Sequence, residues 1–269
     1  RKKGYQTPES GKAAKGTNIV NIIQVETGER VQAMLHFREK GDEKLYLTMV
    51  TRNGTVKRLP VETLKNLRNN GIRALNLDEG DELVAVRETD GSQRILIATH
   101  DGMACVFDET DVRAMGRTAV GVRGIRLREG DYVVGAARAQ EGKEVLTITE
   151  KGYGKKTPVE EYRITNRGGK GVKTINITEK TGKLISIQAV TDDNDLMIIN
   201  RSGLTIRTAV SQIRLAGRAT QGVRIINLRE GDAIASVMAV PAAGEEEEVQ
   251  PAEGVETGGE TPGAAPAEE

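Results

Sequence analysis

The 269-residue chain is 37% hydrophobic but only 3% aromatic, and it contains no Trp, so any core must be built from Val, Ile, Leu and Ala. Its one cysteine, Cys105, excludes an internal disulfide, suits a reducing cytoplasm and is expected to be a small core residue. No stretch reaches the roughly eighteen apolar residues of a membrane span, and the N-terminus carries no apolar signal region, so we expect a cytoplasmic protein without a membrane partner. The chain begins at Arg1 rather than Met, which indicates a fragment.

The formal net charge of zero conceals two parts of different charge. Residues 241–269 contain nine Glu and no Lys or Arg, which leaves 39 basic and 30 acidic side chains in residues 1–240, a net charge of +9. The tail is rich in Glu, Gly, Pro and Ala, a composition that cannot bury enough apolar surface to fold. We therefore predict a folded domain over 1–240 and a disordered acidic tail over 241–269, which either keeps the protein in solution or competes with an anionic ligand for the basic domain.

A glycine pattern with a period of about fifty residues repeats along the folded part. Apolar residues stand four and six positions after each glycine, with a polar residue between them, as in Ile125-Arg126-Leu127. This alternation predicts a strand with one buried face. The marker glycines, at spacings of 55, 50, 50 and 51 residues, are Gly16, Gly71, Gly121, Gly171 and Gly222.

Each of the four complete repeats also contains a predicted β-hairpin, because two strand-like runs flank a dipeptide that tolerates positive φ. The runs 45–50, 95–98, 145–148 and 196–199 lead into Asn53-Gly54, Asp101-Gly102, Lys151-Gly152 and Ser202-Gly203. A further turn, Glu-Gly-Asp in three repeats, precedes another apolar run such as 83–86. Four strands in about fifty residues predict an all-β, propeller-like array of four-stranded antiparallel blades. Helical repeats of about 33 or 34 residues do not fit.

Basic residues recur in register with the repeat. They stand two positions after and four positions before most marker glycines, and a second set follows the hairpin turns. On blades arranged around an axis they would form a basic belt, which suits a long polyanion such as double-stranded DNA. The alternative is that periodic Arg and Lys protect sheet edges from aggregation. The candidate DNA-contacting residues are Lys57, Arg58, Arg68, Arg73, Arg117, Arg123, Lys155, Lys156, Arg167, Lys170, Lys173, Arg207, Arg218 and Arg224.

No catalytic or metal site can be assembled from the sequence. His36 and His100 are far apart, and no Cys/His cluster has the spacing of metal ligands. Gly152-Tyr153-Gly154-Lys155-Lys156-Thr157 lacks the full spacing of a phosphate loop and lies in a predicted hairpin, so we interpret it as structural. The sequence therefore predicts a binding domain with no catalytic residue and no bound cofactor of its own.

Three runs closely resemble the C-terminal domain of the DNA gyrase A subunit: Met115 to Ile125, Glu150 to Pro158 and Thr220 to Arg224. The resemblance covers residues 1 to about 240. It implies a β-pinwheel, usually of six blades that exchange strands, of which about four to five are present here. It also implies that the domain wraps duplex DNA around its basic rim, so that an ATP-dependent type IIA topoisomerase introduces negative supercoils. The implied protein partners are the rest of the gyrase A subunit and the gyrase B subunit, and the catalytic tyrosine and the use of ATP and Mg²⁺ belong to other parts of that complex.

The chain departs from the family at one motif. The Gln-Arg-Arg-Gly-Gly-Lys-Gly box is absent, and residues 166–171, Asn-Arg-Gly-Gly-Lys-Gly, are a partial echo of it. We expect the box, the first blade and most of the second to lie upstream of Arg1, and this chain to bind and bend DNA. Two alternatives stay open: the equivalent domain of topoisomerase IV, whose blades are fewer and less regular, and a propeller-like scaffold that binds an acidic protein. The regular Gln-Gly-Val-Arg and Val-Gly-Val-Arg sequences favour gyrase.

Overall fold

The computed structural model describes residues 21, 23, 28, 31–35, 44–64, 71–140 and 142–242. The marker glycine Gly16, the candidate Arg68 and the predicted acidic tail beyond residue 242 lie outside these ranges. Within the described part of the chain, no helix is both long and apolar enough to cross a bilayer.

The described residues form four antiparallel sheets, the blades. The first blade contains β3 (Leu83–Thr89), β1 (Tyr46–Thr51), β2 (Thr55–Pro60) and β6 (Val122–Arg123), in that order. The second contains β7 (Val133–Arg138), β4 (Arg94–Thr99), β5 (Met103–Asp108) and β10 (Val172–Lys173). The third contains β11 (Leu184–Val190), β8 (Glu144–Thr149), β9 (Tyr153–Pro158) and β14 (Val223–Arg224). The fourth contains β15 (Ile234–Pro241), β12 (Asn194–Asn200) and β13 (Thr205–Ala209). A single turn of 3₁₀ helix follows β2, β5, β9 and β13: η3 (Val61–Leu64), η4 (Glu109–Asp111), η5 (Val159–Glu161) and η6 (Val210–Gln212).

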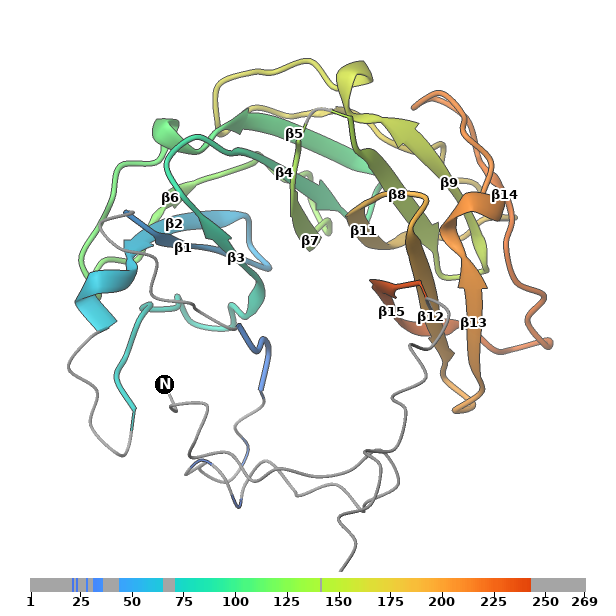
Figure 1. Cartoon of the computed structure of the whole chain (residues 1–269), viewed down its shortest axis with the longest axis horizontal. Helices are drawn as coiled ribbons and strands as arrows, with labels where there is room; N and C mark the ends of the chain where they lie inside the picture. Colours follow the sequence, from blue (N-terminus) through green and yellow to red (C-terminus); the bar gives the residue numbers. More distant parts are fainter. Residues whose placement is uncertain are drawn as a thin grey trace, which may run out of the picture.

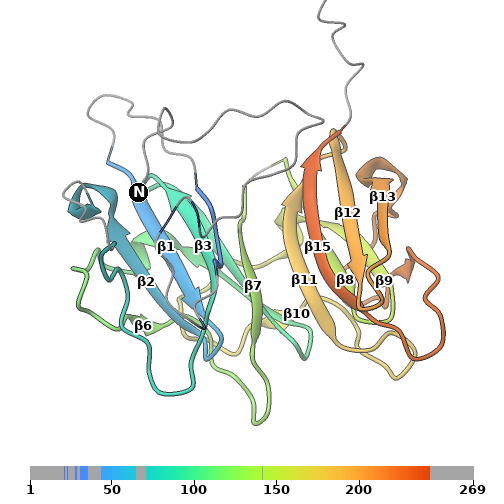
Figure 2. The same cartoon turned by 90° about the horizontal axis from the view of Figure 1, so that it is seen from below.

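The blades follow one another along an arc (Figure 1). Strands β3, β7, β11 and β15 line its inner side, and each of these inner strands contacts the next (Figures 1 and 2). Strands β6 and β14 lie at the outer edge of their sheets. The inner and outer edges of the blades are therefore made by different parts of each repeat.

All four predicted hairpins are confirmed: β1 pairs with β2, β4 with β5, β8 with β9, and β12 with β13. The hairpin glycines have φ angles between 78° and 86°, a region that glycine adopts without strain. The Glu-Gly-Asp turns support the hairpins, because the carboxylate of Asp81 accepts a hydrogen bond from the backbone N–H of Asn53 at 2.9 Å. Asp131 makes the same contact with Asp101 at 2.9 Å. The repeated aspartate thus fixes the hairpin turn from the neighbouring loop.

The fourth strand of a blade comes from the next repeat. Strand β6 follows β5 in the sequence but pairs with β2, and the chain then returns to β7 beside β4. The same exchange pairs β10 with β5 and β14 with β9. Three stretches of chain run from the 3₁₀ turn across the neighbouring blade and back. We call them the crossover segments: residues 112–125, 162–175 and 213–226.

The prediction of a strand is wrong at each of the described apolar triplets, and the predicted burial is correct for Ile125, Ile175 and Ile226 but not for Leu77, which is 47% exposed. Ile125, Ile175 and Ile226 are buried, but they lie just after the two-residue outer strands rather than in a strand. The backbone N–H groups of Gly124 and Ile125 both point at the carbonyl of Gly54, at 2.8 and 3.4 Å. The segment is therefore held by a hairpin tip, which turns it inward and leaves no ladder for a longer strand.

The core lies between successive blades. One cluster joins side chains of the first and second blades, including Val50, Val56, Ile97 and Phe107, around Ile125 of the first crossover segment. Cys105 belongs to this cluster and is 1% exposed, which confirms it as a small core residue. Two further clusters repeat the arrangement at the next two seams.

Candidate nucleic-acid interface

The outer strands carry one exposed cation each: Arg123 on β6, Lys173 on β10 and Arg224 on β14. The marker glycine two residues earlier explains why the strand can lie so close to its neighbour. A Cβ at Gly121 would lie 2.7 Å from the carbonyl oxygen of Val56, and one at Gly171 would lie 2.4 Å from that of Ala104. The glycine thus allows the outer strand to pair, and the pairing places the following cation on the rim.

The cations four residues before the marker glycine have mixed environments. Arg117 is exposed, whereas Arg167 and Arg218 are half-buried. Arg167 donates to the carbonyl oxygens of Asp111 at 2.9 Å and Arg123 at 3.2 Å. Arg218 donates to the carbonyl oxygen of Lys173 at 3.0 Å. Arg167 and Arg218 therefore join neighbouring crossover segments, with part of each side chain still open to solvent.

The prediction that Lys57 and Lys155 contact DNA is wrong, because both side chains are fully buried. The Lys57 ammonium donates to the carbonyl oxygens of Ala74, Arg117 and Ala119 at 2.8, 2.8 and 2.7 Å. Lys155 makes the equivalent hydrogen bonds in the third blade, with Gly217, Arg218 and Thr220. Each lysine satisfies backbone acceptors of a crossover segment and cannot reach DNA.

The prediction that Arg58 and Lys156 contact DNA is also wrong, because both side chains are buried. Arg58 is 8% exposed; it donates to the carbonyl of Val112 at 2.8 Å and lies 3.5 Å from the Glu109 carboxylate. Lys156 is 4% exposed and forms ion pairs with Glu144, at 2.8 Å, and Asp192. A buried cation that is already paired with a carboxylate is not available to bind a phosphate.

Three other candidates lie on the surface. Arg73 is exposed two residues after Gly71, and Lys170 is exposed in the second crossover segment. Arg207 is exposed on β13, but its guanidinium forms an ion pair with Asp195 at 2.7 Å. Arg207 is therefore the least available of the exposed candidates.

A further periodic set was missed in the sequence. Arg113, Arg163 and Arg214 are all exposed, and each lies at the start of a crossover segment. The residue after each one forms a parallel bridge with the preceding blade: Ala114 with Arg58, Ile164 with Val106, and Leu215 with Lys156. The available signal was an arginine eight positions before Gly121, Gly171 and Gly222. We define the crossover belt as Arg113, Arg117, Arg123, Arg163, Arg167, Lys170, Lys173, Arg214, Arg218 and Arg224.

Among the described residues, no group of three or more His, Cys, Asp or Glu side chains could hold a metal ion. Residues 152–157 lie in a hairpin tip and in β9, and Lys155 within them is buried against backbone carbonyls. The exposed cations of the crossover belt suit the binding of an extended anion.

Comparison with known proteins agrees with this architecture. The sequence profile described as "DNA gyrase C-terminal domain, beta-propeller" matches residues 45–90, 93–140, 143–191 and 194–241. The DNA gyrase A subunit of Clostridium acetobutylicum is 50% identical over 224 residues, which cover 83% of this chain and 27% of that protein. The DNA gyrase A subunit of Halalkalibacterium halodurans is 48% identical over 256 residues, covering 95% and 30%. The chain thus spans less than a third of the length of these relatives.

Two solved structures share the fold. The C-terminal domain of DNA topoisomerase IV superposes with a TM-score of 0.78 at 27% identity, covering 84% of this chain and 71% of that one. A DNA gyrase A C-terminal domain gives a TM-score of 0.75 at 23% identity, covering 84% and 75%. At the level of sequence, the 50% and 48% identities are to proteins named as the A subunit of DNA gyrase.

Proposed function

Because the chain belongs to the DNA gyrase C-terminal domain, beta-propeller family, we propose that it binds double-stranded DNA along the crossover belt and bends it around the blades. In this proposal it works as a non-catalytic, DNA-wrapping part of the gyrase A subunit in the bacterial cytoplasm. The remainder of the gyrase A subunit and the gyrase B subunit are its protein partners. Strand cleavage and the use of ATP and Mg²⁺ belong to those other parts, and this chain needs no cofactor to bind DNA.

The observation that carries the proposal is the threefold repetition of the belt. Each crossover segment places an Arg at its start and an Arg or Lys on its outer strand, and these exposed cations form no ion pair with another described residue. Duplex DNA carries about one negative charge per 1.7 Å, and its counterions are released when cations replace them. Bending 20 to 30 base pairs by 40 to 90° costs roughly 1 to 6 kcal/mol, so binding energy must be spread along the path. A repeated belt on an arc meets that requirement.

The regularity of the repeats and the sequence identities favour gyrase over topoisomerase IV as the parent enzyme. The relatives at 50% and 48% identity are named as gyrase A subunits, whereas the topoisomerase IV domain shares 27%. Topology assays on the intact parent would check this, because only gyrase introduces negative supercoils into relaxed DNA.

The direct test is a gel-shift titration of the chain against duplexes of increasing length in moderate salt. We expect affinity to rise with length until the duplex spans the belt. The variant R123A/K173A should bind more weakly at every length, whereas K44A/R207A, which removes two exposed cations outside the belt, should bind like the original chain. Length-independent binding, or no binding, would contradict wrapping and favour a scaffold that binds protein.

A further inference from the structure

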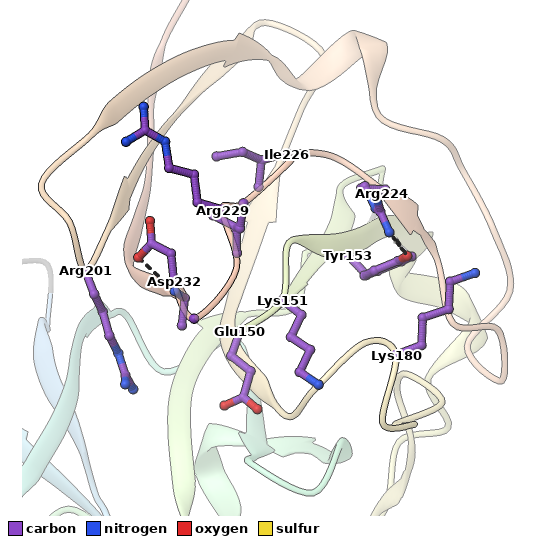
Figure 3. Close-up of a pocket in the computed structure, with 12 residues that line it drawn as sticks. Glu150, Lys151, Tyr153, Lys180, Arg201, Arg224, Ile226, Arg229 and Asp232 are labelled. Atoms are coloured by element: carbon purple, nitrogen blue, oxygen red, sulfur yellow. Dashed lines mark hydrogen bonds between the residues drawn. The ribbon is translucent and has the colours of Figure 1, made fainter.

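A cavity of about 470 Å³ lies at the seam between the third and fourth blades (Figure 3). Lys151, Tyr153, Lys180 and Arg224 lie on one side of it, and Arg201, Arg229 and Asp232 lie on the other (Figure 3). Ile226 and Leu228 add apolar surface to the lining. Its volume falls in the range of small-molecule sites.

The charge of the lining is strongly unbalanced. Five cations border the cavity, all of them exposed: Lys151, Lys180, Arg201, Arg224 and Arg229. None of the five takes part in an ion pair with another described residue. Only Glu150 and Asp232 oppose them. Cations gathered around a cavity without carboxylate partners attract anions and repel one another in their absence.

Of the two acids, Asp232 is already committed to the hairpin turn of the fourth blade. Its carboxylate accepts hydrogen bonds from the Asn200 side chain at 2.6 Å, the Ser202 hydroxyl at 2.9 Å and the backbone N–H of Ala233 at 2.9 Å. A carboxylate held by this many donors stays in its turn. Among the described lining residues, Glu150 is therefore the only acid whose carboxylate is not held by hydrogen bonds of this kind.

Tyr153 organises one side of the cavity. Its hydroxyl oxygen lies 2.8 Å from Nη2 and 3.2 Å from Nε of Arg224, and Lys180 Nζ lies 5.6 Å from the centre of its ring. The corresponding residues of the first and second blades are Thr55 and Met103, neither of which has an aromatic ring. At the seam between the second and third blades, Lys183 is instead neutralised by Asp101 at 2.5 Å. The seam of the third and fourth blades therefore differs from that of the second and third in the cations that carry no carboxylate partner.

We propose that this cavity binds a ligand with clustered phosphate groups. Arg201 and Arg229 can meet phosphate oxygens with paired N–H donors. Arg224, whose Nε and Nη2 already bind the Tyr153 hydroxyl, and the two Lys side chains add positive charge. The phosphates come either from a free oligophosphate or from DNA that leaves the belt at Arg224, which belongs to both surfaces. Binding of a free oligophosphate does not depend on the proposed DNA wrapping.

The test is isothermal titration of the full chain with sodium tripolyphosphate at low salt. We expect saturable binding at one site per chain, weakened at least about tenfold in K180A/R229A, because two charge-assisted hydrogen bonds to phosphate disappear. The matched control R113A/R163A removes the same charge from the belt and should change the affinity less than about twofold. Both pairs are exposed, so circular dichroism should show unchanged folds. No saturable binding, or equal losses of affinity in the two variants, would overturn the site.

A second experiment, which measures DNA binding, identifies the source of the phosphates. If DNA supplies them, tripolyphosphate should compete with duplex DNA, and K180A/R229A should bind DNA with a shallower dependence on salt than the original chain. If the ligand is free, K180A/R229A should bind DNA unchanged while losing its affinity for tripolyphosphate. Failure of DNA wrapping itself would appear as weak DNA binding by the original chain, with tripolyphosphate binding intact.

Discussion

The ammonium group of Lys155 donates a hydrogen bond to the backbone carbonyl oxygen of Arg218, 2.7 Å away. The lysine belongs to β9 of the third blade, and the arginine belongs to the crossover segment that arrives from the next repeat. A buried cation thus holds in place the loop that carries a belt cation. The buried Lys155 therefore supports the rim without adding to its exposed charge.

Replacing Lys155 with Met should lower the free energy of unfolding by about 3 kcal/mol, because the carbonyl oxygens of Gly217, Arg218 and Thr220 lose their shared donor in a buried position. Urea unfolding monitored by circular dichroism would measure the loss. Lys180→Met is the matched control, since Lys180 is exposed and should change stability little. Equal stability of the two variants would contradict the structural role of Lys155.

Stability should also depend on the protonation of Lys155. Burial lowers the pKa of its ammonium group to about 8, only partly offset by the attraction of Glu161. Between pH 8 and the ordinary lysine pKa of 10.5, the unfolded chain keeps a proton that the folded chain releases, so this group makes folding more favourable as pH rises. The free energy of unfolding of the original chain should therefore rise relative to Lys155→Met by up to about 1.4 kcal/mol per pH unit across that window. Urea titrations of both proteins at pH 7.5 and 9.5 test this, and parallel pH profiles would refute it.

Gly171→Ala should destabilise the chain far more than Gly130→Ala. Both glycines have φ near +75°, which costs an alanine about 1 kcal/mol or more. Only at Gly171 would the new Cβ also meet backbone, 2.4 Å from the carbonyl oxygen of Ala104, whereas nothing lies within 4 Å at Gly130. The difference between the two variants, expected to be about 2 kcal/mol, isolates the effect of close packing between the crossover and β5. Similar urea midpoints would show that β10 can move away without cost.

The arginines at the start of the crossover segments should contribute to DNA affinity. The triple variant R113A/R163A/R214A should lower the slope of log K against log[salt] by up to about 0.9 for each phosphate that is no longer neutralised. The set Arg73, Arg123, Lys173 and Arg224, changed together to Ala, should do the same. Fluorescence anisotropy with a labelled duplex at several salt concentrations would give both slopes. An unchanged slope in either variant would remove that set from the interface.

Removal of the acidic tail should tighten DNA binding. A chain that ends at Ala242 lacks the nine glutamates, and their competition with DNA should matter most at low salt, where charges are least screened. The same anisotropy titrations, with and without the tail, measure the effect. Equal affinities would leave the tail only a role in solubility.

Sequence periodicity located the repeats, the hairpins and the outer cations because each depends on local rules. Asn53-Gly54 and its equivalents favour a turn through a glycine at positive φ. Arg123, Lys173 and Arg224 each follow a glycine that packs against a neighbouring strand. Periodicity could not separate a buried from an exposed cation. Lys57 and Lys155 occupy the same position of the first and third hairpins, but they do so because equivalent backbone carbonyls of a crossover segment face each of them.

The sequence by itself therefore determined the blade as a unit, the fold family and the existence of a charged rim, since alternation, turn chemistry and repeat length are encoded within about fifty residues. Only the tertiary structure decided which blade receives each outer strand and which cations face solvent. Strand exchange brings residues about sixty positions apart together, such as Lys57 and Arg117, and burial is set by those distant partners. The cation-lined seam between the third and fourth blades has the same origin, because its walls come from hairpin tips and a crossover that meet only in the folded array.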